Sequence, residues 1–280
     1  MRVVGVDWAA NPVDRAAVVL NIRDDGSIVI VQVTTPLDNQ CAIDFCKSGQ
    51  NDVVAVDTPF AWPREFRDFV SAWTPSCGAV AKPPESRRFR YRLTDRFVHD
   101  KTNKWPLSVS TNLFALGARA WASIVHANHL YKQVAVCRET LANTTRPHIV
   151  EVYPGATLRA FENYEPLNIS GTSTRISKQG DDATEENYSY KTDEITRRAL
   201  VEAVIDVFQI QAEGSVIDQI VATGKKDHAT DGLLAAVSGL ILLDLVDGWG
   251  TWYPDTDQIE DAKAEGWIFF PRKLSEGEKR

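Results

Sequence analysis

Two short apolar segments of the chain each end on an aspartate. Residues 3–6 lead into Asp7, and residues 53–56 lead into Asp57. This composition is typical of buried strands, and the carboxyl end of a strand holds a side chain rigidly toward a cleft. A third acidic segment, residues 227–231, has an aspartate at each end and begins a long apolar stretch. We expect these side chains to form one acidic cluster.

Clustered carboxylates repel one another, so their charged forms require a counter-ion. Oxygen ligands favour Mg²⁺ or Mn²⁺ over zinc, and two such ions about 4 Å apart can activate water and stabilise the leaving oxygen of a phosphodiester. We therefore predict that four residues are both metal ligands and catalytic groups, namely Asp7, Asp57, Asp227 and Asp231.

Alternative roles remain open for several of these residues. Asp227 and Asp231 share a helix face, but they also fit an N-cap and a solvated first-turn acid. Glu151 lies between two valines in a predicted strand, where an unpaired charge is costly. We name Glu151 as a further catalytic candidate, which either joins the cluster or binds a basic residue. His228 is either a proton shuttle or a packing residue.

Basic residues gather between residues 82 and 104, interleaved with aromatic ones. This pattern suits phosphate binding and base stacking, although a solvated face has the same composition. Lys191 and Arg198 adjoin a predicted helix and can reach a phosphate, with ordinary surface charge as the alternative. The candidate substrate-binding residues are Arg88, Arg90, Arg92, Lys191 and Arg198.

The elements that position these residues follow from the hydrophobic pattern. Residues 3–8, 15–22 and 27–33 predict an antiparallel meander, with a turn at Asp24-Asp25-Gly26. A helix over 39–47, with Asp38 as its N-cap, leads to the strand that ends at Asp57. This crossover predicts parallel strands with Asp7 and Asp57 side by side at one sheet edge.

The rest of the chain predicts one domain over 1–272 and a frayed tail over 273–280. Six prolines and the basic run predict an irregular insertion over about 59–110. Beyond it we expect helices over 111–128, 194–211 and 227–246, strands over 148–153 and 266–270, and a mobile surface loop over 168–191.

Composition narrows the class of protein. The chain has 280 residues and a net charge of −7, which argues against a protein whose whole surface is basic and binds nucleic acid. Its four cysteines are scattered, which argues against a disulfide framework. No apolar run is long enough to cross a bilayer. We expect a cytoplasmic protein with no membrane partner, and a homo-oligomer stays open.

Six motifs, taken in order, resemble the DUF429 family. The resemblance spans nearly the whole chain. The motifs are Gly5-Val6-Asp7-Trp8-Ala9, Val56-Asp57-Thr58-Pro59, Arg92-Leu93-Thr94-Asp95, Val150-Glu151-Val152-Tyr153-Pro154, Asp227-His228-Ala229-Thr230-Asp231-Gly232 and Glu265-Gly266-Trp267-Ile268.

This resemblance implies an α/β fold of ribonuclease H-like type, with a mixed five-stranded sheet in the order 3-2-1-4-5 flanked by helices. Related RuvC-type nucleases place carboxylates on the first strand, the fourth strand and a late helix. Asp7, Asp57, Asp227 and Asp231 match those places. The chain departs from that pattern at Asp57, where many such enzymes have glutamate, and at Gly232, where alanine is usual.

The sequence thus predicts a metal-dependent nuclease or related phosphodiester hydrolase acting on nucleic acid or a nucleotide. The alternative is a non-catalytic nucleic-acid or nucleotide-binding module on the same fold. Phosphotransfer ranks last, because the chain lacks a glycine-rich phosphate loop.

Overall fold

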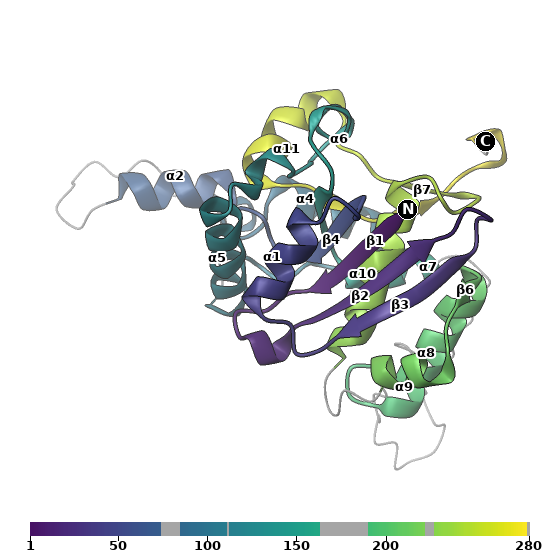
Figure 1. Cartoon of the computed structure of the whole chain (residues 1–280). Coiled ribbons are helices and arrows are strands. Elements are labelled where there is room, and N and C mark those ends of the chain that lie inside the picture. Colours follow the sequence, from purple (N-terminus) through teal and green to yellow (C-terminus); the bar gives the residue numbers. More distant parts are fainter. Residues whose placement is uncertain (74–84, 111, 163–189, 222–226, 279–280) are drawn as a thin grey trace, which may run out of the picture.

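A mixed sheet lies at the centre of the protein. The computed structural model describes residues 1–73, 85–110, 112–162, 190–221 and 227–278 (Figure 1). Within these residues the sheet has seven strands in the order β6-β3-β2-β1-β4-β5-β8. Their bounds are β1 Arg2–Asp7, β2 Ala16–Ile22, β3 Ile28–Thr34, β4 Val53–Asp57, β5 His148–Val152, β6 Ile210–Gln211 and β8 Ile268–Phe269.

The order of the first five strands confirms the predicted 3-2-1-4-5 arrangement. β1 pairs antiparallel with β2 and parallel with β4, and β2 pairs antiparallel with β3. In the parallel pair Asp7 stands at the same register as Asp57. The short strands β6 and β8 extend the two edges of the sheet by parallel pairing, and sequence analysis did not predict β6 as a strand.

Helices cover both faces of the sheet. On one face α10 (His228–Leu242) packs against β1, β2 and β4 (Figure 1). Nearly all of α10 is buried, as its apolar sequence predicts. The opposite face packs on α1 (Asn39–Lys47) and α5 (Asn112–Ala127). The side chain of Asp38 caps α1 by accepting a hydrogen bond from the Cys41 amide, as predicted.

The segment 59–110 is more regular than expected. Its described residues form three helices, α2 (Arg64–Ala72), α3 (Ser86–Arg90) and α4 (Leu93–Thr102). Proline does not prevent helix formation here, because Pro63 occupies the N-cap of α2 and lies before its first turn. The predicted insertion thus includes short helices among its described residues, and residues 74–84 lie outside the described part.

The remaining elements complete the covering layers. The predicted loop at 168–191 lies almost wholly outside the described residues. Within the predicted tail, Lys273 ends a short strand and Glu276–Glu278 form a 3-10 turn, while residues 279–280 lie outside the described part. The remaining helices are α6 Arg138–Asn143, α7 Pro154–Glu162, α8 Glu194–Val207, α9 Gly214–Val221 and α11 Ile259–Glu265, and a second small sheet pairs β7 Trp249–Thr251 with β9 Pro271–Lys273. None of the helices described is long and apolar enough to cross a membrane.

A glycine contact brings α10 very close to β1. A Cβ atom placed on Gly5 would lie 2.1 Å from the carbonyl oxygen of Gly232 and 2.2 Å from the amide nitrogen of Ala236. Only glycine permits this approach of backbone to backbone. The contact fixes the N-terminal turns of α10 against the strand that ends at Asp7, and so fixes the distance between their acidic side chains.

A candidate metal centre at the carboxyl edge of the sheet

Three aspartates from three elements converge at one point. Asp7 ends β1, Asp57 ends β4, and Asp231 lies in the first turn of α10. Each offers a carboxylate oxygen, and these oxygens all lie within 4.8 Å of one another. Asp7 is 9% exposed and Asp231 is 6% exposed. The structure therefore brings together three of the four predicted metal ligands.

Burial raises the pKa of all three carboxyl groups, and neighbouring acids add to the effect. Burial, followed by the charges of Asp7 and Asp231, holds the pKa of Asp57 well above its ordinary value. Burial likewise raises the pKa of Asp231 to about 7, against the lowering effect of a neighbouring lysine. Burial also raises the pKa of Asp7. A buried set of oxygen ligands with excess negative charge fits a hard divalent cation such as Mg²⁺ or Mn²⁺.

A lysine ammonium lies beside this cluster. Lys191 Nζ is 3.0 Å from Asp231 Oδ2 and 2.8 Å from Asp227 Oδ2. Although burial alone would lower it, these two carboxylates raise the pKa of Lys191. The hydroxyl of Tyr190 donates to Asp231 Oδ1 at 2.9 Å. Lys191 thus contacts the acidic cluster. Its charge is therefore not an ordinary surface charge, which was the alternative interpretation.

Asp227 stands one position outside the helix. It occupies the N-cap of α10, but its side chain makes no capping hydrogen bond and instead pairs with Lys191. The group of converging ligand atoms consists of Asp7, Asp57 and Asp231. Asp227 therefore lies at the rim of the cluster, and its predicted role as a metal ligand stays a prediction.

His228 contacts the first aspartate of the cluster. Its Nδ1 lies 2.5 Å from Asp7 Oδ2, and its Nε2 lies 3.9 Å from Asp14 Oδ1. The hydrogen bond to Asp7 raises the pKa of His228 despite partial burial. His228 thus orients the Asp7 carboxylate, and it lies three residues before Asp231 on the same side of α10.

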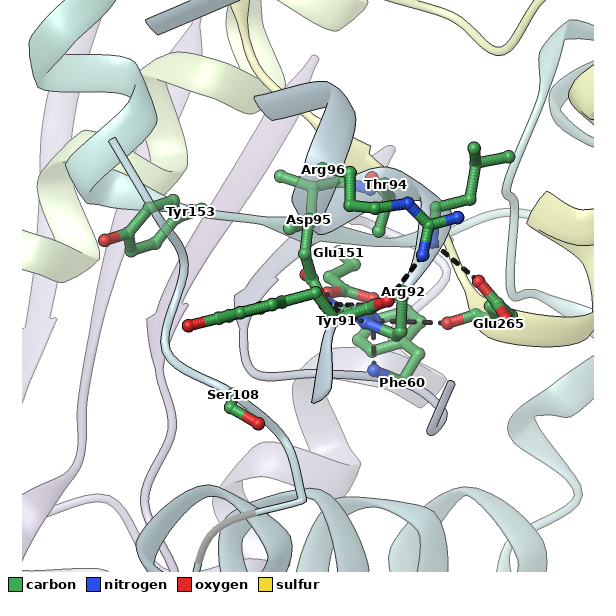
Figure 2. A network of polar contacts seen from close by, with 12 residues as sticks. Phe60, Tyr91, Arg92, Thr94, Asp95, Arg96, Ser108, Glu151, Tyr153 and Glu265 are labelled. Carbon is green, nitrogen blue, oxygen red and sulfur yellow. Dashed lines mark hydrogen bonds and ion pairs between the residues drawn. The ribbon is translucent and has the colours of Figure 1, made fainter. Parts of the chain in front are cut away.

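Glu151 binds an arginine of the insertion, one of its two predicted fates (Figure 2). The Arg92 guanidinium donates from Nη2 to Glu151 Oε1 at 2.6 Å and from Nη1 to Oε2 at 2.9 Å. Arg92 also donates to Asp95 at 2.8 and 3.1 Å. Arg92, Asp95 and Glu151 are each at least 98% buried. Arg92 is thus engaged inside the protein, which leaves it poorly placed to hold a substrate phosphate.

The pair of Arg92 and Glu151 also anchors the loop that follows the second aspartate. Glu151 Oε2 accepts a hydrogen bond from the Phe60 amide at 3.0 Å, only three residues after Asp57. Burial raises the pKa of Glu151, while the guanidinium of Arg92 opposes that shift. We therefore describe Glu151 as a residue that positions this loop.

Sequence analysis missed a second buried acid, Glu265. It is 3% exposed and lies beside Arg92 in Figure 2. Its carboxylate accepts from the amide of Arg64 at 2.6 Å and from that of Leu93 at 2.7 Å. Those two amides open α2 and α4, so one carboxylate neutralises the positive ends of both helices. The only signal in the sequence was its place in the last family motif.

The other predicted substrate-binding arginines do not line the cluster. Arg88 lies on α3, 3.8 Å from Glu65, and the guanidinium of Arg90 lies over the Tyr91 ring. Arg198 on α8 pairs with Asp218 at 2.7 Å. The neighbouring aromatic rings mostly contact one another, as Tyr91 and His99 do with Trp105 at ring-centroid distances of 4.3 and 3.9 Å.

The acidic cluster lies in a cavity of about 820 Å³. This volume is within the range of about 300–1,000 Å³ that is typical of small-molecule sites. Asp14, Lys104, Arg159 and Lys191 line it together with the aspartates, and the remaining lining is largely apolar.

The raised pKa of Asp57 predicts an unusual effect of pH on stability. Without metal, Asp57→Asn should have a higher Tm than the wild type at pH 8. Below the ordinary pKa of aspartate, Asp57 is protonated in both the folded and the unfolded chain. As the pH rises, the folded state keeps this proton to a higher pH than the unfolded state does. The wild type therefore loses stability with rising pH, whereas the uncharged amide of the variant does not. Thermal unfolding in EDTA at pH 4 and pH 8 measures this, with exposed Asp44→Asn as the matched control.

A wild-type Tm equal to or above that of Asp57→Asn at pH 8 would show that the carboxylates do not repel one another in the metal-free protein. A gain of the same size in Asp44→Asn would show a general effect of surface charge. Adding Mn²⁺ should reverse the order of the two proteins, because only the wild type keeps the full set of ligands.

A family model supports the resemblance found in the motifs. The model described as "Protein of unknown function (DUF429)" matches residues 5–246, which is most of the chain. No match was found among curated proteins or among solved structures. The chain belongs to the DUF429 family.

Proposed function

We propose that this DUF429 member is a metal-dependent phosphodiester hydrolase of the ribonuclease H-like type, acting on nucleic acid or a nucleotide. The observation that carries the proposal is the convergence of Asp7, Asp57 and Asp231, whose ligand oxygens lie within 4.8 Å of one another at the carboxyl edge of parallel strands. Crevices at this edge are the usual ligand sites of α/β sheets.

Each residue of the site has a role in this proposal. Asp7, Asp57 and Asp231 would hold Mg²⁺ or Mn²⁺, which lowers the pKa of water and stabilises a leaving oxygen. His228 orients the Asp7 carboxylate through its 2.5 Å contact. Lys191 neutralises two carboxylates before the metal arrives, and its ammonium can then contact a substrate phosphate. Tyr190 fixes Asp231 through its hydroxyl group.

A second candidate function is a non-catalytic nucleotide-binding module. The contacts of Lys191 favour it, because an ammonium already compensates two of the acidic side chains in the absence of any ion. Calorimetric titration with Mn²⁺ separates the candidates. The hydrolase requires binding of the metal, whereas a module of this kind shows no binding at millimolar concentration.

Asp7→Asn should abolish cleavage that the wild type performs with Mn²⁺. The amide keeps the shape of the side chain but removes a charged metal ligand, so we expect a loss of at least about a hundredfold in rate and weaker Mn²⁺ binding. The measurement uses labelled single-stranded, duplex and branched nucleic acids. Asp44→Asn, on the exposed side of α1, is the matched control.

Equal cleavage by the wild type and Asp7→Asn would assign the activity to a contaminant or to another site. A loss of activity without a loss of Mn²⁺ binding would place Asp7 outside the metal centre. The near-native thermal unfolding of the variant must be checked alongside, because Asp7 is buried.

A further inference from the structure

The shape of the cavity narrows the substrate of the proposed hydrolase. We propose that the site admits a single nucleotide unit, either within a very small phosphodiester or at the end of a single strand, and not the interior of a continuous strand. This inference rests on the proposed function. Its first support is the volume of about 820 Å³, which suits one small ligand.

The lining of the cavity matches the two halves of a nucleotide. The aspartates and Lys191 provide the metal and phosphate end. The same cavity is lined by an apolar wall, which we define as Pro106, Leu107, Phe114, Leu116 and Leu158. Leu107 is 59% exposed and Leu116 is 52% exposed, although both are large apolar side chains. Apolar surface beside a polar centre favours a ligand with a flat, weakly polar part such as a base.

The charges around the cavity argue against a long polyanion. Binding of an extended strand depends on several phosphate contacts from lysine and arginine. Among the described residues, Arg88, Arg90 and Arg198 instead contact Glu65, Tyr91 and Asp218, respectively. The cavity lining contains Lys104, Arg159 and Lys191, as well as Arg92, which is bound to Glu151, beside a larger number of acids. The first three of these cations can hold the phosphate of one unit rather than follow a backbone.

Three substrates test the inference with Mn²⁺ present. They are a dinucleoside monophosphate, a linear single strand labelled at either end, and a covalently closed single-stranded circle of the same sequence. We expect hydrolysis of the dinucleoside monophosphate, with an intact circle. Release of mononucleotides from the linear strand would show that the site accepts the ends of single strands. An intact linear strand would show that the site accepts only small phosphodiesters.

Opening of the circle at the rate of linear cleavage would overturn the inference while supporting the proposed hydrolase. Hydrolysis of none of the three substrates would instead count against the proposed function itself. The two failures are therefore distinguishable in one set of assays.

A variant of the apolar wall provides a second readout. Leu107→Glu should raise KM for the dinucleoside monophosphate about tenfold with little change in kcat, since it removes apolar contact and adds a charge that repels phosphate. Binding of adenosine monophosphate, measured by calorimetry, should weaken in parallel. The control is Val31→Glu, which is 49% exposed on β3 and lines no part of this cavity. An unchanged KM in Leu107→Glu would refute the role of the wall.

Discussion

Gly5→Ala is expected to destabilise the protein by about 3 kcal/mol or more and to weaken Mn²⁺ binding. The added Cβ would lie 2.1 Å from the Gly232 carbonyl oxygen and 2.2 Å from the Ala236 amide nitrogen. Both are backbone atoms, so no change of rotamer relieves the overlap, and α10 must move away from β1. Overpacking of this kind costs about 1–3 kcal/mol, and occasionally more when it is severe.

The movement also separates two ligands of the proposed metal centre, because Asp7 ends β1 and Asp231 lies on α10. Equilibrium unfolding in guanidinium chloride gives the stability change, and calorimetry gives the affinity for Mn²⁺. We expect both quantities to fall together in Gly5→Ala.

Gly232→Ala is the matched control from the other side of the same contact. Its Cβ would lie 3.5 Å from the Gly5 carbonyl oxygen and from Val18, which is ordinary contact. Alanine also favours a helix over glycine by about 1 kcal/mol. This variant should equal or exceed the wild type in stability. If both alanine variants behave alike, the close approach of α10 does not set the geometry of the site.

The strand-end aspartates could be predicted because local patterns determine them. Apolar runs indicate β1 and β4, and the intervening α1 makes the strands parallel. Asp7 and Asp57 each end their run, so they lie at the same edge of the sheet. The role of Asp231 as a candidate ligand could be predicted from its place in the first turn of an apolar helix. These inferences need no knowledge of distant side chains.

The partners of the site could not be predicted in the same way. Lys191 reaches Asp231 across 40 residues, and Arg92 reaches Glu151 across 59. In the sequence Arg92 is one of several arginines in a basic run, and nothing local marks it as the buried one. The choice depends on how α4 packs against α7, α11 and β8, which is a property of the whole fold. The pattern therefore predicts the ligands better than the groups that orient and neutralise them.

Arg92→Leu is expected to lower the free energy of unfolding by about 3–5 kcal/mol, because it leaves buried carboxylates without their cation. Arg92 contacts Glu151 at 2.6 and 2.9 Å and Asp95 at 2.8 and 3.1 Å, and it also donates to the backbone carbonyl of Glu265 at 3.1 Å. Leucine replaces none of these hydrogen bonds. Arg198→Leu, an exposed arginine on α8, should change the unfolding midpoint little.

Glu151→Gln should have a much smaller effect on stability than Arg92→Leu. The ion network of Arg92, Asp95 and Glu151 has one more negative than positive charge, so removing one carboxylate charge leaves a balanced pair of Arg92 and Asp95. The amide oxygen of glutamine can still accept from the Phe60 amide. Urea unfolding of both variants measures the asymmetry. Equal losses would mean that Glu151 needs its charge to hold the loop after Asp57, in which case Mn²⁺ affinity should fall in Glu151→Gln as well.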